Sequence, residues 1–461
     1  MKLNFRVTLM GILFFTTTTF YGCDQKEVGN ISVITPQVPV TSTGAKSYYI
    51  SDGTGSDANT GLSISAPLKT ITAGQNLVAP GDTVFIMNGN YTPATTIQLL
   101  KSGTADKYIT YKAYKGHSPK FSFLGSIWNA VSINGSYIIV EGIEFQGNNQ
   151  NLTYADALAS YNDKLAGGNN NNLYATYNMN GVSIGGPAAE SKLPHHIVIR
   201  NCKIHDFPGG GLSSIQADYT TFEGNTVYNN AWYMMYGGSG ISILTPFDSD
   251  TKTSYKNIVR NNICYNNKTT IPWISQQRLS DGNGIIIDVN HRPYTSTATD
   301  KPYIGRTLVE NNVCFNNGGS GIHAFDAAHI DIINNTAYNN AQIMLTYADI
   351  FANTCEDVKI MNNIIYTKVG GNCNSNNKNT NVTYDYNIYF VGKVAVKGAN
   401  DKVMDPQFVN LSSDGTVANF SLKSGSPAVD AGTQSIFSPR DIRGVARPKG
   451  ASVDCGAYEV Q

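Results

Sequence analysis

The sequence predicts an all-β protein, built as a parallel β-solenoid, and three observations support this fold class. A six-residue unit recurs through the middle of the chain. Each unit follows a short β-branched segment, and several precede a glycine-rich turn and a second short segment such as Gly240-Ile-Ser-Ile. The units begin at Asn201, Asn225, Asn262, Asn312, Asn335 and Asn363. Because no single coil can bury its own apolar edge, such units are expected to stack into one continuous core.

The spacing of the units separates the scaffold from its insertions. Successive units begin 24, 37, 50, 23 and 28 residues apart. The shorter spacings match one coil of a parallel β-solenoid. The two longest therefore indicate loops inserted on a constant scaffold, where function usually lies. Asparagines aligned at one turn are expected to hydrogen-bond up and down the stack and to satisfy buried backbone groups.

The first residues are predicted to form a targeting signal, which is not part of the folded domain. Lys2 and Arg6 precede an apolar run over 7–15, and Gly22-Cys23 follows. Residues 1–22 resemble a bacterial lipoprotein signal peptide, which is too short to span a membrane permanently. We expect acylation of Cys23, which would tie the protein to the bacterial outer membrane or cell surface; an ordinary secreted protein is the alternative. Residues 23–45 are expected to form a flexible tether.

The rest of the chain, residues 46–461, is predicted to form one domain. Its opening segments (48–57, 67–73 and 80–86) and closing segments (425–432 and 453–459) resemble right-handed parallel β-helix proteins of the pectate-lyase-like class. The resemblance implies an N-terminal cap helix and first coil over 46–95 and a closing segment over 400–461. That class holds polysaccharide lyases, glycoside hydrolases, epimerases and surface proteins without catalytic activity, so the fold alone does not decide the function.

Composition excludes nucleic acid as a partner and favours sugars. The chain has 33 Lys and Arg against 33 Asp and Glu, and only 14% of its residues are charged. No basic patch compensates for that balance, so there is no field to attract nucleic acid. Cys23 aside, six cysteines remain, and their spacing fits no zinc site. Cys355 and Cys373 are candidates for a disulfide in an oxidising compartment.

Alternation within the strands assigns residues to the core or to the surface. In the first strand of each coil we expect an inward column and, one residue later, an outward column in which Glu223, Arg260 and Glu310 stack. A stabilising ion ladder and a row of substrate contacts are both consistent with that stack. The expected inward column is Val198, Phe222, Val259, Val309, Ile332 and Ile360.

A second strand column points to the candidate site. If Ile241, Ile285 and Ile322 face inward, then Ser242, Ile286 and His323 face outward, followed by Leu244, Asp288 and Phe325. The insertions surround this face, and we expect them to supply aromatic platforms and cations for a sugar. The predicted substrate-binding residues are Trp232, Tyr236, Trp273, Arg278, His291 and Arg292.

The segment 281–288 brings two carboxylates, Asp281 and Asp288, to this face. In a glycoside hydrolase, one would protonate the leaving oxygen and the other would activate water or attack carbon. In a lyase acting on uronates, Asp281, Asn283 and Asp288 are candidate ligands for Ca²⁺, and His323 is the candidate base. The bland alternatives are a turn signal for the Asp-Gly pair and a solvated surface position for the histidine.

The resemblance departs from calcium-dependent lyases at this face. Those enzymes carry clustered acidic residues on consecutive coils and a lysine or arginine base on a strand, whereas the matching strands here carry Ile286 and His323. We nevertheless predict a monomeric polysaccharide lyase acting by β-elimination, with Ca²⁺ as a candidate cofactor and a membrane contact through the lipid anchor. A glycoside hydrolase is the first alternative, and a surface glycan-binding protein without catalytic activity is the second.

Overall fold

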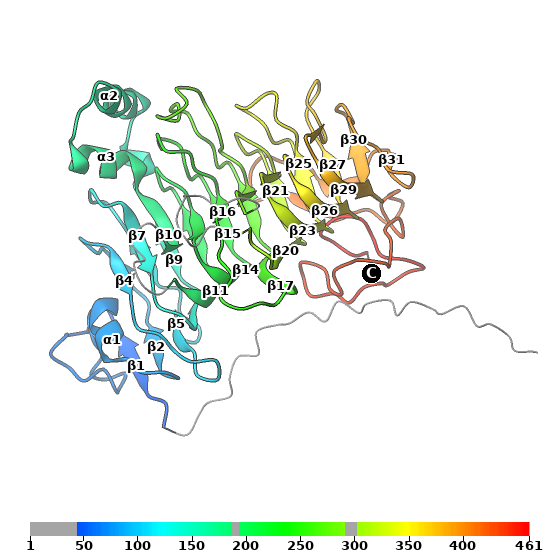
Figure 1. The fold of residues 1–461 in the computed structure, drawn as a ribbon. Coiled ribbons are helices and arrows are strands. Elements are labelled where there is room, and N and C mark those ends of the chain that lie inside the picture. The colour runs from blue at the N-terminus through cyan, green and yellow to red at the C-terminus, as the bar shows by residue number, and fades with distance from the viewer. Residues whose placement is uncertain (1–43, 187–192, 291–301, 461) are drawn as a thin grey trace, which may run out of the picture.

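The computed structural model describes residues 44–186, 193–290 and 302–460 as a right-handed parallel β-helix (Figure 1). Three long parallel sheets form its sides, and each coil except those at the two ends adds one strand to each sheet. The predicted all-β solenoid is therefore confirmed. Among the described residues, no helix is long and apolar enough to cross a membrane.

The sheets are called 1, 2 and 3 here, and within a coil the chain passes from sheet 1 to sheet 3 and then to sheet 2. Sheet 1 comprises β1 (Ser47–Ile50), β2 (Thr83–Ile86), β5 (Ile109–Ala113), β8 (Ile138–Glu141), β11 (His195–Arg200), β14 (Asp218–Glu223), β17 (Tyr255–Arg260), β20 (Arg306–Glu310), β23 (Ala328–Ile333), β26 (Glu356–Met361) and β29 (Thr380–Asp385). Sheet 2 comprises β4 (Ile97–Leu99), β7 (Asn129–Ile133), β10 (Asn180–Gly185), β13 (Leu212–Ile215), β16 (Ile241–Leu244), β19 (Ile285–Asp288), β22 (Ile322–Phe325), β25 (Ile350–Asn353) and β28 (Asn376–Asn377). Sheet 3 comprises β3 (Asn90–Tyr91), β6 (Lys120–Ser122), β9 (Glu144–Gln146), β12 (Lys203–His205), β15 (Thr226–Tyr228), β18 (Ile263–Tyr265), β21 (Val313–Phe315), β24 (Thr336–Tyr338), β27 (Ile364–Tyr366), β30 (Ile388–Phe390) and β31 (Lys402–Val403).

Few elements lie outside these sheets in the described part of the chain. Helix α1 (Ile71–Leu77) begins after Thr70, whose hydroxyl caps the amide of Ala73, and it contacts β1, β2 and β4. It lies where the resemblance places a cap helix. A short 3₁₀ helix (Asn149–Asn151), α2 (Tyr154–Leu165) and α3 (Asn171–Asn178) interrupt the coil between β9 and β10. An antiparallel pair, β32 (Phe408–Asn410) and β33 (Asn419–Leu422), lies in the closing segment.

The core of the solenoid follows the predicted alternation. Ile241, Ile285 and Ile322 pair in register and are fully buried. Asparagines stack at the turn between sheets 1 and 3: Asn225, Asn262 and the asparagines of later coils each accept a hydrogen bond from the backbone amide one coil earlier. The expected asparagine ladder is therefore present, and it satisfies backbone groups that the buried turns would leave without partners.

The first unit of the repeat differs from its predicted alignment by one residue. Ile199 pairs with Phe222, so Ile199 and not Val198 continues the inward column. For the same reason Cys202, whose amide donates to Asn225 Oδ1 at 3.0 Å, stands at the ladder position that was assigned to Asn201. Counting from the first asparagine of the unit failed here, because that asparagine belongs to the preceding turn, where it adopts a positive φ.

The outward column of sheet 1 is an ion ladder. Glu223 pairs in register with Arg260, and Arg260 with Glu310. The guanidinium nitrogens of Arg260 lie 3.6 Å from Glu223 and 3.7 Å from Glu310. Since Arg260 and Glu310 are buried, a row of substrate contacts is ruled out and the stabilising ladder stands.

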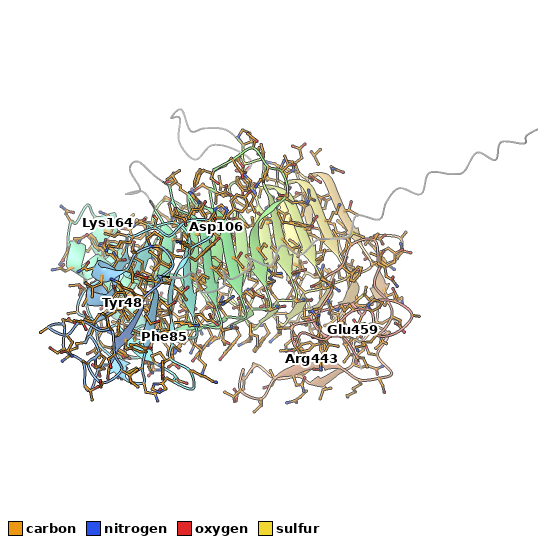
Figure 2. All side chains as sticks on the ribbon, turned by 90° about the horizontal axis from the view of Figure 1, so that it is seen from below. Tyr48, Phe85, Asp106, Lys164, Arg443 and Glu459 are labelled. Carbon is orange, nitrogen blue, oxygen red and sulfur yellow. The ribbon has the colours of Figure 1, made fainter. Side chains whose placement is uncertain are left out.

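The closing segment folds back along the side of the solenoid (Figure 2, toward Arg443 and Glu459). Asn311 donates to Ser438 Oγ at 2.7 Å and accepts from Arg447 at 2.8 Å, and Asn362 donates to the carbonyl of Ile436 at 2.8 Å. Arg447 is itself buried against Glu459 at 3.1 Å. The segment therefore covers the turns of several coils.

The described cysteines are all free and buried. The proposed pairing of Cys355 with Cys373 is wrong for this structure: the Cys355 thiol donates to the carbonyl of Ala324 at 3.3 Å, and Cys373 to that of Phe390 at 3.9 Å. Burial raises the pKa of both thiols, to about 11 and about 12, so both behave as small apolar core residues.

Candidate functional site

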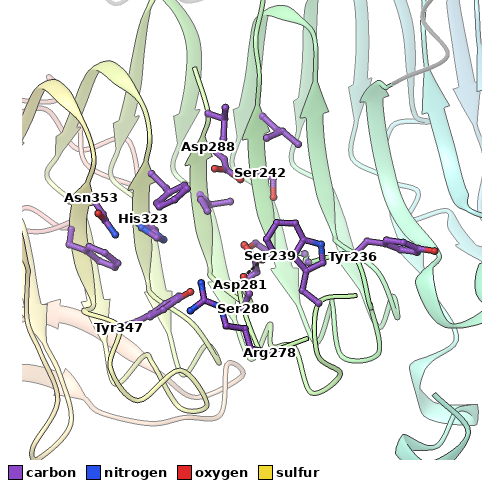
Figure 3. Close-up of a pocket in the computed structure, with 18 of the residues that line it drawn as sticks. Tyr236, Ser239, Ser242, Arg278, Ser280, Asp281, Asp288, His323, Tyr347 and Asn353 are labelled. Atoms are coloured by element: carbon purple, nitrogen blue, oxygen red, sulfur yellow. Dashed lines mark hydrogen bonds between the residues drawn. The ribbon is translucent and has the colours of Figure 1, made fainter. Parts of the chain in front are cut away.

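A cavity of about 610 Å³ lies on the outer face of sheet 2 over β16, β19, β22 and β25 (Figure 3). Its floor is the outward column Ser242, Ile286 and His323, which pair in register as predicted. The next outward positions, Leu244, Asp288 and Phe325, also line it. The walls come from the loops before β16, β19 and β25, which contribute Tyr236, Trp273, Arg278, Ser280, Asp281 and Tyr347.

His323 is the most unusual residue of the floor. It is 5% exposed, and neither ring nitrogen has a hydrogen-bond partner among the described residues. Its ring stacks on Phe351, with centroids 4.1 Å apart, and the Tyr347 ring lies 5.8 Å away. Burial lowers the pKa of His323 to about 3, so the imidazole is neutral at neutral pH. A neutral imidazole that faces a cavity with both nitrogens free is able to accept a proton from a ligand.

Asp288 lies one strand from His323 on the same face. Its Oδ1 atom has no hydrogen-bond partner within the described parts of the chain. Burial, followed by the negative charges of Asp281 and Asp326, raises the pKa of Asp288 to about 8. Around neutral pH this side chain is therefore mostly a neutral carboxylic acid, which can donate a hydrogen bond or a proton.

Asp281 folds back from its turn into the cavity, so the structure brings both carboxyl groups of the segment 281–288 together. Its Oδ2 accepts a hydrogen bond from the Ser280 hydroxyl at 2.6 Å, while burial raises its pKa. Gly237 makes this position possible: at φ +74°, a Cβ atom there would lie 2.6 Å from Asp281 Oδ2. The close approach of a loop backbone to a carboxyl group requires glycine at this point.

The rim of the cavity is aromatic and carries an exposed cation, Arg278. The amide of Trp273 donates to the carbonyl of Arg278 at 2.9 Å, which closes a tight hairpin. The exposed Arg278 side chain lies close to Tyr347 in Figure 3. Tyr236 and Trp273 are half-buried and offer ring surface. Aromatic faces beside a guanidinium suit a sugar that carries an acidic group.

One of the predicted substrate contacts, Trp232, does not line this cavity, and two others lie outside the described residues. The indole N–H of Trp232 donates to the carbonyl of Asn266 at 3.1 Å, and the Lys268 ammonium lies 4.1 Å above its ring. The prediction for Trp232 is corrected accordingly, because its ring packs on the neighbouring coil. His291 and Arg292 lie outside the described residues, as does Cys23.

The structure does not fit the three-ligand calcium site. Asn283 is buried, and its Oδ1 accepts from the amide of Ser320 at 2.9 Å while its Nδ2 donates to Ser239 Oγ at 3.1 Å. Its amide is thus part of the turn stack. Across 44–186, 193–290 and 302–460, no group of three or more His, Cys, Asp or Glu side chains is placed to hold a metal ion. No step of the chemistry below depends on calcium.

The sequence analysis missed Tyr347 and Phe351. Phe351 pairs in register with His323, and counting the outward column one coil further would have found it. Tyr347 comes from an irregular loop before β25, where periodicity gives no signal.

The comparisons with known proteins agree with this architecture. The family model for the Pel9A-like, right-handed β-helix region matches residues 48–363. The chain belongs to this family. The match covers the coils that form the cavity and ends before the closing segment.

Individual relatives are distant. Pectate lyase L of Paenibacillus polymyxa (strain SC2) is 26% identical over 292 residues, which are 58% of this chain and 57% of that protein. The matched region thus spans less than two thirds of that relative. The crystal structure of pectate lyase Pel9A is 18% identical with a TM-score of 0.51, over 92% of this chain and 98% of that one. A solved glycoside hydrolase is 10% identical with a TM-score of 0.51, over 77% and 95%. These two structures show the shared fold and leave the reaction open.

Proposed function

We propose that this protein is a carbohydrate-active enzyme that cleaves a uronate-containing polysaccharide by β-elimination. The observation that carries the proposal is the buried His323 imidazole, whose two nitrogens have no partner among the described residues and which faces a cavity beside Asp288. Membership of the Pel9A-like family and the pectate lyase relative support the same reaction class.

In the proposed step, a nitrogen of His323 takes the proton from C5 of the uronate. The electron pair of that C–H bond forms the C4=C5 double bond, and the C4–O bond breaks. The neutral carboxyl of Asp288 gives its proton to the leaving oxygen. Solvent then returns the imidazolium proton to the carboxylate, so both groups regain their starting states. The products are an unsaturated uronate at one new end and a free hydroxyl at the other.

Arg278 and the bound substrate prepare the base. The exposed guanidinium of Arg278 at the rim pairs with the uronate carboxylate. It thereby stabilises the negative charge that moves onto the carboxylate when C5 loses its proton. A substrate carboxylate near His323 also raises the pKa of that imidazole from its low value in the free enzyme, because a nearby negative charge favours the imidazolium. The ring faces of Trp273 and Tyr236 stack on neighbouring sugars.

Hydrolysis by Asp281 and Asp288 is the second candidate, and the presence of two carboxyl groups in one cavity favours it. An inverting or retaining hydrolase needs one protonated and one ionised carboxyl group. Here burial raises the pKa of both, and among the residues described no cation pairs with either. Both carboxyl groups therefore tend to stay protonated, which suits an acid but not the ionised carboxylate that hydrolysis also needs. For this reason elimination with His323 as the base is preferred.

The test uses residues 24–461 on uronate and neutral polysaccharides, with ultraviolet absorbance and new reducing ends recorded together. Growth of both signals establishes elimination. New reducing ends without a rise in ultraviolet absorbance would show that the reaction is hydrolysis. If neither signal appears on any substrate while the glycan still binds, the protein is the glycan-binding alternative. Chelator in a parallel assay tests the predicted calcium.

We also propose that the enzyme is anchored at the cell surface through an acylated Cys23, as the signal peptide over residues 1–22 predicts. Labelling of cells with a fatty acid should mark the full-length protein, and Cys23→Ala should abolish the label and release the protein from membranes. An unlabelled protein that fractionates with the medium would leave ordinary secretion as the explanation.

A further inference from the structure

On the side nearer the N-terminus, the lining of the cavity ends at Tyr236 (Figure 3). It occupies the outer face of β16, β19, β22 and β25, and on the β16 side it is lined by Tyr236, Gly237 and Gly238 of the loop 231–238. Ser213 is the outward residue of the preceding strand, β13, in register with Ser242, but it does not line the cavity. The backbone of the loop 231–238 stacks on the loop before β19, because the amides of Ile274 and Gly282 donate to the carbonyls of Met235 and Gly238 at 2.8 Å. Its Tyr236 side chain lies on the side of the cavity nearer the N-terminus (Figure 3), and this ring with its supports is called the wall here.

The helical insertion supports this wall from behind. The amide of Met235 donates to Asn178 Oδ1 of α3 at 2.8 Å, and the Tyr233 hydroxyl donates to the carbonyl of Leu152 at 3.2 Å. A separate apolar cluster joins the helices to the loop; it contains Ala157, Tyr161, Tyr174, Tyr177, Tyr233, Met235 and Ile271. Figure 1 shows α2 and α3 over the early coils only. A wall held by buried rings and hydrogen bonds is not free to swing aside when a polymer arrives.

Trp128 completes the support. Its ring centroid lies 5.9 Å from that of Tyr236, and its indole N–H donates to Asn171 Oδ1 of α3 at 3.0 Å. Trp128 thus connects the helical insertion to the residue that lines the cavity.

The cavity runs across the strands, along the axis of the solenoid. Arg278, Ser280 and Tyr347 line one long edge, whereas Leu244 and Val289 line the other. In the direction away from the wall, its lining continues to Asn353 and Ser375. Sheet 2 then ends at β28, whose residues Asn376 and Asn377 are both exposed. A glycan chain can leave the cavity on that side.

We propose that the enzyme attacks its polysaccharide from a chain end, with the terminal sugar stopped by the wall of Tyr236 and Trp128. This inference rests on the proposed function, because it fixes which bond of the polymer reaches His323 and Asp288. Between the wall at β16 and the residues on β19 and β22 lie one to two strand spacings, up to about 10 Å, which is room for roughly one or two sugar residues. The product is therefore a short unsaturated fragment of one size.

The first experiment compares bond cleavage with chain length for the wild-type protein, residues 24–461, on a long uronate polymer. We expect viscosity to fall slowly relative to ultraviolet absorbance, and a monosaccharide or disaccharide product from the earliest time point. A rapid fall in viscosity with a ladder of oligosaccharide sizes would overturn the chain-end inference while leaving elimination intact. Absence of any cleavage would count against the proposed function itself.

The second experiment opens the wall. The double variant Trp128→Ala, Tyr236→Ala should admit longer chains past β16, so we expect products several sugars longer and a steeper fall in viscosity for each bond broken. Tyr154→Ala is the matched control, because Tyr154 lies on α2 but is 50% exposed and outside the wall; its product pattern should equal that of the wild type. If the folded double variant still releases only the wild-type fragment, the wall does not set the product length.

Discussion

Two outward columns of the same solenoid have opposite characters. On sheet 1, Glu223, Arg260 and Glu310 alternate in sign, so each charge faces an opposite charge on the next coil. On sheet 2, Ile286, His323 and Asp288 include buried polar atoms for which the described residues provide no partner. Strand spacing and register are the same in both columns. Arg260 and Glu310 also hold buried atoms without a hydrogen-bond partner, so unpartnered atoms alone do not separate the two columns. The ladder charges face opposite charges, whereas His323 and Asp288 line a cavity. Charge pairing therefore marks the ladder as structural, and polar groups that face a cavity mark sheet 2 as the candidate site.

The largest difference between the two columns is expected when the proposed base, His323, is removed. His323→Ala should lower kcat by about 10²- to 10⁴-fold, the range that general base catalysis supplies. Glu223→Gln, in the other column, should leave kcat unchanged, and both proteins should remain folded by circular dichroism. Equal activity losses in the two variants would erase the distinction between the columns.

Removal of one charge from the ladder should lower stability and leave activity unchanged. Arg260→Met leaves Glu310 buried without its partner, so we expect a loss of about 3 kcal/mol in the free energy of unfolding. Activity per folded molecule should not change. Urea denaturation followed by absorbance and fluorescence measures the first quantity, and initial rates below the transition measure the second. A fall in kcat with intact stability would place the ladder in the site after all.

The pH profile distinguishes the acid from the base. The proposed elimination needs Asp288 protonated and His323 neutral, so activity should decline as pH rises through about 8, the pKa of Asp288. Asp288→Asn should remove this alkaline limb and lower the plateau by about 10- to 100-fold. The rates are to be measured from pH 5 to pH 10. An alkaline limb that persists in Asp288→Asn would assign it to another group.

The smallest effect concerns stability in acid. The pKa of His323 is lowered to about 3, so between that pH and its ordinary value the unfolded chain binds a proton that the folded chain does not. Stability must then fall with acidification by up to about 1.4 kcal/mol per pH unit through this one group. His323→Phe, which preserves a ring beside Phe351, should gain stability relative to the wild type as pH drops from 6 to 4, in about this proportion. A difference that stays constant across that range would contradict the buried neutral histidine.

The residues of the two columns were predicted well from the sequence, because side chains in any β-strand alternate between its two faces. Ser242, Ile286, His323 and Asp288 were found by alternation alone, since every second residue of a strand faces the same side. Alternation failed at Val198, and the prediction for the loop residue Trp232 failed for a different reason. At Val198 the count began from the wrong asparagine, and at Trp232 an aromatic residue in a loop was taken for a ligand contact.

Loops carry the part of the site that no period predicts. Tyr347 reaches the cavity from an irregular segment, and Asn283 looked like a metal ligand until its amide was seen to bridge Ser239 and Ser320. The helical insertion behind Tyr236, α2 and α3, was also not predicted from the sequence.

The closing segment contacts coils that are made before it, and this order matters during synthesis. Coils contact mainly their neighbours, so they can assemble one after another as the chain emerges. Arg447 reaches Asn311 only after the last part of the chain is made. Until then, the apolar side chains of Ile333 and Met361, which pack beside Ile436, lack their cover. A chain cut short before residue 436 would thus hold every coil of the cavity and still be the form most exposed to aggregation and proteolysis.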